Sequence, residues 1–160
     1  MKKIVATLLG ASLVCGFAGC GGGGSGAAEI PDTPEGAAYE YRHSVMEALA
    51  FKVGRLRSMA MGETPANDAA FAKDANDVAA LSGMLAEGFI PNSIVGPSIA
   101  LPEIWMNKAD FDAKAMAFHN NAQALATAAT QQGFEAAKGM VQAVGGGCGD
   151  CHRPYRRRQQ

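Results

Sequence analysis

The chain has 160 residues, of which 48% are hydrophobic and 18% charged, and its formal net charge is −1 at pH 7. This balance provides no strongly basic surface, so nucleic acid is excluded as a partner. Only four cysteines are present, and Cys15 and Cys20 precede the region of mixed composition, so a disulfide framework is excluded as well.

The first nineteen residues have the features of a bacterial export signal. Lys2 and Lys3 precede an apolar run that is too short and wrongly flanked for a membrane-spanning helix. The run ends in "FAGC", which resembles the lipobox of bacterial lipoproteins, where the cysteine sulfur is acylated after cleavage. The sequence predicts a lipoprotein signal peptide over 1–19 and lipidation of Cys20. Ordinary cleavage near Ala18 is the alternative, because Phe17 is an unusual first residue for a lipobox.

Acylation of Cys20 would anchor the protein on the periplasmic side of a Gram-negative bacterium. Several acyl chains on one residue hold stably, since each buried methylene adds about 0.8 kcal/mol. Gly21, in the position after the cysteine, favours the outer membrane. The stretch "GGGGSGAAEIPD" that follows has nothing to bury, so residues 20–32 are predicted to be a lipidated cysteine and a flexible tether. One folded domain is left, over 33–160.

Four helical segments are predicted in the domain, because helix-favouring residues dominate and apolar residues recur at alternating steps of three and four. The first begins at Pro34, behind a capping Asp32 or Thr33. The second begins at Asn67 or Asp68 and ends at "EGFIPN".

A longer connection, "NSIVGPSIALPEIW", leads to the third segment, which ends at Gly133, and the fourth runs from Phe134 to Tyr155. Four such helices with mostly short connections predict an all-α, antiparallel four-helix bundle. The predicted core positions are Tyr39, Arg42, Met46, Leu49, Val53, Leu56 and Ala60; Phe71, Ala75, Val78, Leu85 and Phe89; Phe111, Ala115, Phe118, Ala122, Leu125 and Ala129; and Phe134, Ala137, Val141, Val144, Cys148, Cys151 and Tyr155.

The motif "CGDCH" in the last segment places two thiols and an imidazole, those of Cys148, Cys151 and His152, on one helical face. This spacing is typical of c-type haem attachment, in which the cysteines form thioethers and the histidine ligates iron. A strained disulfide and half of a metal site are the alternatives, although His43 and His119 stand apart from any second ligand cluster.

Three glycines precede the motif, at 145–147. Each costs about 1 kcal/mol in a helix relative to alanine. One hypothesis is that they let a porphyrin lie close to the helix backbone. The alternative is that the helix is frayed or broken at this point.

With these motifs in place, the chain resembles the cytochrome c′ family, the four-helix-bundle c-type cytochromes that include low-spin relatives. The resemblance rests on "YRHSVM", "PEIW" and "CGDCHRPYR", with the haem motif on the last helix, and it extends from about Tyr39 to Arg158. Leu101 departs from the family, which often has a basic residue there. The resemblance implies a four-helix bundle with one covalently bound haem c.

The resemblance also assigns roles to individual residues. It makes Cys148 and Cys151 the thioether anchors, His152 the proximal iron ligand and Arg42 a partner of the haem propionates. An arginine that extends out between helices is the alternative for Arg42. Met46 matches the residue over the distal side of the iron and is the candidate sixth ligand. His43 is its rival, but it points about 100° away from the helix face of Arg42.

Met46 separates two functions. As a ligand it would suit an electron carrier with redox partners in the periplasm or membrane, because a thioether stabilises reduced iron. Left unligated, it would leave a five-coordinate iron that binds nitric oxide or carbon monoxide. Enzyme activity is not expected, because no acid–base pair or nucleophile is visible. Family members are often homodimers through the first two helices, and the resemblance carries that arrangement over as an expectation.

Overall fold

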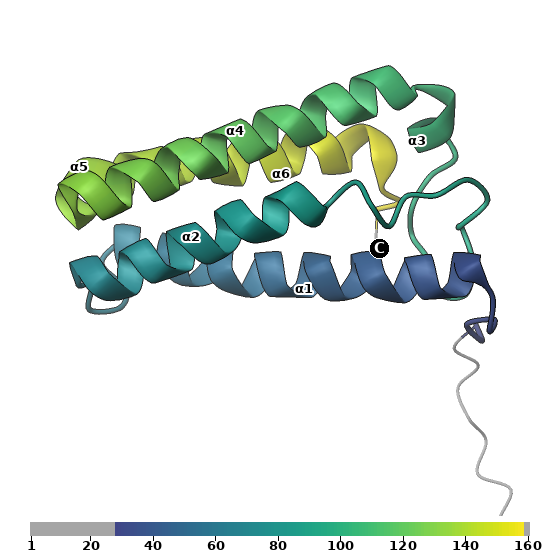
Figure 1. The fold of residues 1–160 in the computed structure, drawn as a ribbon, viewed down its shortest axis with the longest axis horizontal. Coiled ribbons are helices and arrows are strands. Elements are labelled where there is room, and N and C mark those ends of the chain that lie inside the picture. The colour runs from purple at the N-terminus through teal and green to yellow at the C-terminus, as the bar shows by residue number, and fades with distance from the viewer. Residues whose placement is uncertain (1–27, 159–160) are drawn as a thin grey trace, which may run out of the picture.

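A computed structural model describes residues 28–158, and these residues form a bundle of four long helices (Figure 1). The helices are α1 (Pro34–Ala60), α2 (Asp68–Met84), α3 (Glu103–Met106), α4 (Lys108–Gln132), α5 (Phe134–Ala137) and α6 (Val141–Tyr155), with a 3-10 turn η1 (Lys138–Met140) before α6. Within the described part the only β pairing is an isolated bridge between Ala100 and Arg156. The predicted all-α bundle is confirmed.

The long helices pack in the cyclic order α1, α2, α4, α6 (Figure 1). Helices α1 and α6 are therefore adjacent, although they lie at opposite ends of the folded sequence. No helix in the described range is long and apolar enough to cross a membrane. The predicted signal peptide and Cys20 lie outside the described residues.

Local capping residues fix where the helices begin. The Thr33 side chain accepts a hydrogen bond from the Gly36 amide at 3.3 Å, and the Asn67 side chain accepts one from the Ala70 amide at 2.8 Å. At the other end of the bundle, Gly133 stops α4 with a φ of 82°, a conformation that favours glycine. The predicted starts of the first two helices and the end of the third are therefore confirmed.

Nearly all of the predicted core positions are buried or pack against the core. The fully enclosed side chains include Leu56, Phe71, Val78, Phe111 and Leu125. Val45 and Met59 are also buried, although the predicted stripe omitted them.

Two helix boundaries differ from the prediction. The second helix ends at Met84, so Phe89 enters the core from the connection that follows it. The fourth segment is three pieces, because a 3-10 turn centred on Gly139 interrupts it before α6 begins at Val141. Glycine weakens a helix interior, and short 3-10 turns are common at α-helix ends.

A charged cluster joins α1 to α2 on the side of the bundle away from α6. Asp74 is only 1% exposed, and its two carboxylate oxygens accept hydrogen bonds from Lys52 Nζ and Arg55 Nε, each at 2.7 Å. Burial opposes the charged carboxylate, but the two cations outweigh it and hold the pKa of Asp74 below its ordinary value of 3.8. This cluster therefore stabilises the folded chain only while Asp74 is ionised.

Replacing Asp74 with asparagine is expected to lower the free energy of unfolding by about 1–2 kcal/mol at neutral pH, a value discounted because both cations are partly exposed. The depressed pKa makes this contribution present above the unfolded value and lost as pH falls through the folded value. Urea unfolding of wild type and D74N at pH 7 and pH 3 should therefore give two curves that converge at low pH. The D77N variant is the control, with a smaller loss, because Asp77 also contacts Lys52 but is one-third exposed.

Candidate functional site

Two cavities lie between α1 and α6, with volumes of about 370 and 190 Å³. Both are lined by Met46 and Ala50 of α1 and by Cys151 and His152 of α6. The structure thus brings together the candidate sixth ligand and the predicted attachment motif, which are about a hundred residues apart in sequence. The smaller cavity is almost wholly apolar, with Leu49, Val53, Leu85, Ala115 and Phe118 among its walls.

The thiols of the motif are free and half-buried on one face of α6. The Cys148 thiol donates to the Val144 carbonyl oxygen, one helical turn earlier, with Sγ and oxygen 3.6 Å apart. Burial raises the pKa of both thiols. They are therefore protonated at neutral pH, and the disulfide considered from the sequence is not formed.

His152 is half-buried beside the thiols, and its environment favours the neutral imidazole. Burial lowers its pKa, and the positive charge of Arg156 acts in the same direction. Neutral imidazole is the form that binds a metal. Within residues 28–158 no cluster of three or more His, Cys, Asp or Glu side chains is arranged to hold a metal ion.

Arg42 is 5% exposed, and its charge is satisfied by the connection between α2 and α3. Nη1 donates to the Gly88 carbonyl and the Ser93 hydroxyl, both at 3.0 Å. Nη2 donates to the Ser93 carbonyl at 2.5 Å and to the Ser98 hydroxyl at 3.1 Å. A guanidinium has five N–H donors, so these four hydrogen bonds leave the Nε–H as the remaining donor. The expected hydrogen bond from Arg42 to a haem propionate can therefore come only from the Nε–H.

The alternative position for Arg42, extending out between the helices into solvent, is wrong, because the side chain lies in the interior. Gly88 makes the arrangement sterically feasible, since a Cβ at that position would lie 2.6 Å from the Arg42 Cβ and 2.9 Å from the Ala38 carbonyl oxygen. Sequence reasoning missed Gly88, Ser93 and Ser98. No short motif in the sequence marks these three residues.

The end of α6 is tied to the same connection. The Leu101 amide donates to the Tyr155 carbonyl at 3.0 Å, and the Arg157 amide donates to the Ile99 carbonyl at 2.8 Å. Tyr155 is buried, and its hydroxyl donates to the Asp110 carboxylate at 2.5 Å, which raises the tyrosine pKa to about 12. The C-terminal end of α6, beside the larger cavity, is therefore held both by the connection before α3 and by α4.

Four other side chains that could carry chemistry lie outside the core of the site or at its wall. His43 is exposed and 3.7 Å from Glu47, at the wall of the larger cavity, whereas His119 contacts the Ser82 hydroxyl at 2.9 Å away from both cavities. Trp105 donates to the Phe89 carbonyl at 3.2 Å and lies at the bundle end. Of the C-terminal arginines, Arg153 pairs with Asp150.

Of the three glycines before the motif, only Gly147 lines a cavity of the site, the smaller one, as the hypothesis of close porphyrin approach requires. Gly145 and Gly146 are exposed and line neither cavity, and a Cβ on either would meet no atom within 4 Å. A Cβ on Gly147 would lie 3.1 Å from the Phe118 ring, so this glycine allows α6 to approach α4. The helix is unbroken through all three.

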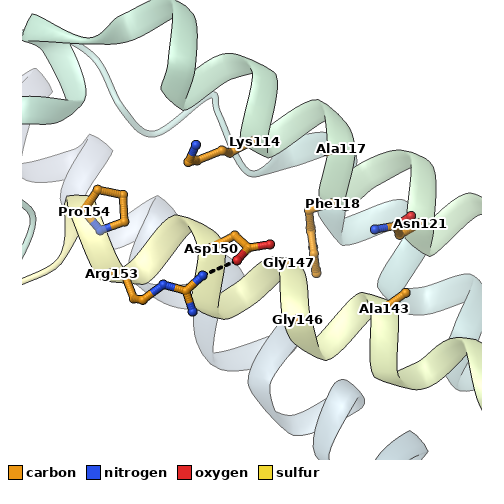
Figure 2. Close-up of a pocket in the computed structure, with 10 residues that line it drawn as sticks. All are labelled: Lys114, Ala117, Phe118, Asn121, Ala143, Gly146, Gly147, Asp150, Arg153 and Pro154. Atoms are coloured by element: carbon orange, nitrogen blue, oxygen red, sulfur yellow. Dashed lines mark hydrogen bonds and ion pairs between the residues drawn. The ribbon is translucent and has the colours of Figure 1, made fainter.

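A different face of α6 borders an outer groove with α4. Figure 2 shows Phe118, Gly146 and Gly147 in this groove, with Lys114 on one side and the paired Asp150 and Arg153 on the other. None of the predicted site residues lines it. The chemistry of the motif therefore belongs to the cavities between α1 and α6.

The cavity residues fit a covalently bound haem c. Two free thiols and a neutral imidazole face an apolar space, as attachment and ligation of a flat apolar ring would require. The larger cavity carries two cations at its polar end, Arg42 and Arg156, which suit the carboxylates at the edge of that ring.

Comparison with known proteins points the same way. The family model described as Cytochrome C' matches residues 37–156. Cytochrome c-554 from Cereibacter sphaeroides is 37% identical over 124 residues, which cover 74% of this chain and 92% of that protein. Cytochrome c prime from Shewanella frigidimarina is 38% identical, with a TM-score of 0.74 over 80% of this chain and 99% of that one. The nitric oxide complex of a mutant cytochrome c prime from Alcaligenes xylosoxidans is 29% identical, with a TM-score of 0.73 over 81% and 99%.

Proposed function

The chain belongs to the cytochrome c′ family, whose members bind one covalent haem c, and from that premise we propose that it is an electron carrier. Bound haem c supplies an iron centre that accepts and releases one electron. Cys148 and Cys151 would hold it as thioethers, and His152 and Met46 would be the two protein ligands of its iron. The observation that carries the proposal is that Met46 and His152 line the same two cavities from opposite helices.

A six-coordinate site with a thioether ligand suits outer-sphere electron transfer. The soft sulfur stabilises reduced iron and raises the potential. Packing between α1 and α6 holds Met46 and His152 in one arrangement, so little rearrangement accompanies the change of charge. The buried Arg42 adds a positive charge near the cavity, which also favours the reduced state.

The visible absorption spectrum of the mature protein tests this function. Oxidised and reduced samples are measured before and after addition of carbon monoxide. A low-spin spectrum with a far-red sulfur-to-iron band, unaltered by carbon monoxide, is the expected result. A high-spin spectrum that changes with carbon monoxide would overturn ligation by Met46.

Binding of a diatomic gas is the second candidate function. The supporting observation is that the side chains around Met46 are apolar, with Leu49, Val53 and Leu85 on the same cavity wall. A relative of 29% identity was determined as a nitric oxide complex. If Met46 leaves the iron open, this apolar wall would face a bound nitric oxide or carbon monoxide.

We also propose that acylation of Cys20 holds the carrier on the periplasmic side of the outer membrane, close to its redox partners. Replacing Cys20 with alanine is expected to move the protein from the membrane fraction to the soluble fraction, as measured by immunoblotting of fractionated cells. Cys15 provides the matched control, because the C15A variant loses a thiol from the signal peptide only. An unchanged membrane fraction for C20A would refute the anchor.

A further inference from the structure

Ser98 lies at the wall of the larger cavity, and the O–H of its side chain is a donor without a protein acceptor in the described residues. It is 8% exposed and lines the cavity beside Arg42. Its oxygen accepts hydrogen bonds from Arg42 Nη2 at 3.1 Å and from the Ala100 amide at 3.3 Å. Within residues 28–158, no group accepts a hydrogen bond from its O–H. A hydroxyl that is over nine-tenths buried with an unused donor marks a place where an acceptor is expected.

Ser93 shows what a purely structural serine looks like in the same loop. Its hydroxyl also accepts from Arg42, at 3.0 Å, but its own O–H donates to the Ile90 carbonyl at 2.8 Å. It is fully buried and lines neither cavity. The hydroxyl of each serine therefore accepts one hydrogen bond from Arg42, and only Ser98 has a donor at the cavity wall.

The charges around Ser98 indicate an anionic acceptor. Arg42 and Arg156 line this cavity, and the one carboxylate on its wall, Glu47, already lies near His43. Arg42 also has its Nε–H left over, as its four other donors are used by the loop. The O–H of Ser98 and the remaining N–H of Arg42 belong to two residues that line the same cavity, and together they suit the two oxygens of a carboxylate.

We propose that Ser98 and Arg42 together bind one haem propionate, with the Ser98 hydroxyl as the donor that positions it. The inference rests on the haem site proposed above, but it does not depend on whether the protein carries electrons or binds gas. Removing the donor leaves a more exposed negative charge near the iron, which favours the oxidised state. Ser98 is thus a positioning residue that raises the reduction potential.

Resonance Raman spectra of the holoprotein test the proposal, because the propionate bending band moves to lower frequency when a hydrogen bond to the carboxylate is lost. The band is expected to shift down in S98A and in S98C, which keeps a side chain of similar size but a weak donor. It should stay in place in S98T, which keeps the hydroxyl, and in S93A, which loses an equivalent contact to Arg42. The reduction potential should fall in S98A and not in S93A.

An unshifted band in S98A and S98C would overturn the proposal. An equal shift in S93A would also overturn it, because the effect would then pass through Arg42. Acetate added to the wild-type holoprotein should leave the band unchanged, and displacement would assign the site to a free carboxylate instead. The band is measurable in a five-coordinate or a six-coordinate protein, so failure of the electron-carrier function would be seen separately in the visible spectrum.

Discussion

Replacing Met46 with alanine is expected to convert the holoprotein from low-spin to high-spin iron and to open it to carbon monoxide. Met46 lines both cavities opposite His152, so its loss removes the only thioether that α1 presents there. Axial ligands set haem potentials over a range of about 0.8 V, so the reduction potential should fall by on the order of 0.1 V. Visible spectra and a redox titration measure both effects.

The matched variant is M46L, which keeps nearly the same volume and lacks the sulfur. Volume-conserving exchanges in a core usually cost less than about 1.5 kcal/mol, so M46L should fold as well as wild type while losing the low-spin spectrum. A second control, M59A, removes a buried methionine of the same helix that lines neither cavity. Wild-type spectra for both M46A and M46L would show that another group holds the sixth position.

Replacing Cys151 with alanine is expected to reduce the yield of mature holoprotein severalfold and to leave haem attached through one link. Cys151 lines both cavities, whereas Cys148 lines only the smaller one, so its loss removes the more central anchor. The remaining vinyl group extends the conjugated system. The pyridine haemochrome spectrum should therefore move to longer wavelength, and denaturing gels stained for haem should show the reduced yield.

Two further variants sharpen this test. In the C148A/C151A double variant no haem should survive denaturation, because both links are gone. In G149A the motif is intact, and the added Cβ would lie 3.3 Å from the end of the flexible Arg153 side chain, so wild-type attachment is expected. A wild-type haemochrome for C151A would contradict the assignment of this cysteine.

The bundle was predictable from sequence because its determinants are local. Thr33 and Asn67 cap the helices that follow them, Gly133 ends one, and alternating steps of three and four place Phe71 and Leu125 in the core. The placement of the two cysteines and His152 was equally predictable, since their spacing alone puts them on one helix face. In each case the information lies within one or two helical turns.

The parts that escaped prediction depend on contacts between distant segments. The partners of Arg42 lie about fifty residues away, in a loop without a motif, and nothing in the spacing of Ser93 and Ser98 pairs them with a guanidinium. The contact of Gly147 with α4 escaped prediction for the same reason, because it depends on Phe118 of another helix, and Gly145 and Gly146 face outward. The close approach of Gly88 to α1 depends likewise on residues of another helix, Ala38 and Arg42.

The pairing of α1 with α6 gives the fold a distinctive order of assembly. A short connection joins α1 to α2 and a longer one joins α2 to α4, but the contacts between α1 and α6 close a loop of about a hundred residues. Such closures carry the largest entropy cost and tend to form late. The hydrogen bonds of Leu101 and Arg157 then bind the chain end to the loop that holds Arg42. The pocket for the cofactor is therefore the last part of the fold to form. A chain truncated before α6 lacks both the pocket and the thiols that line it.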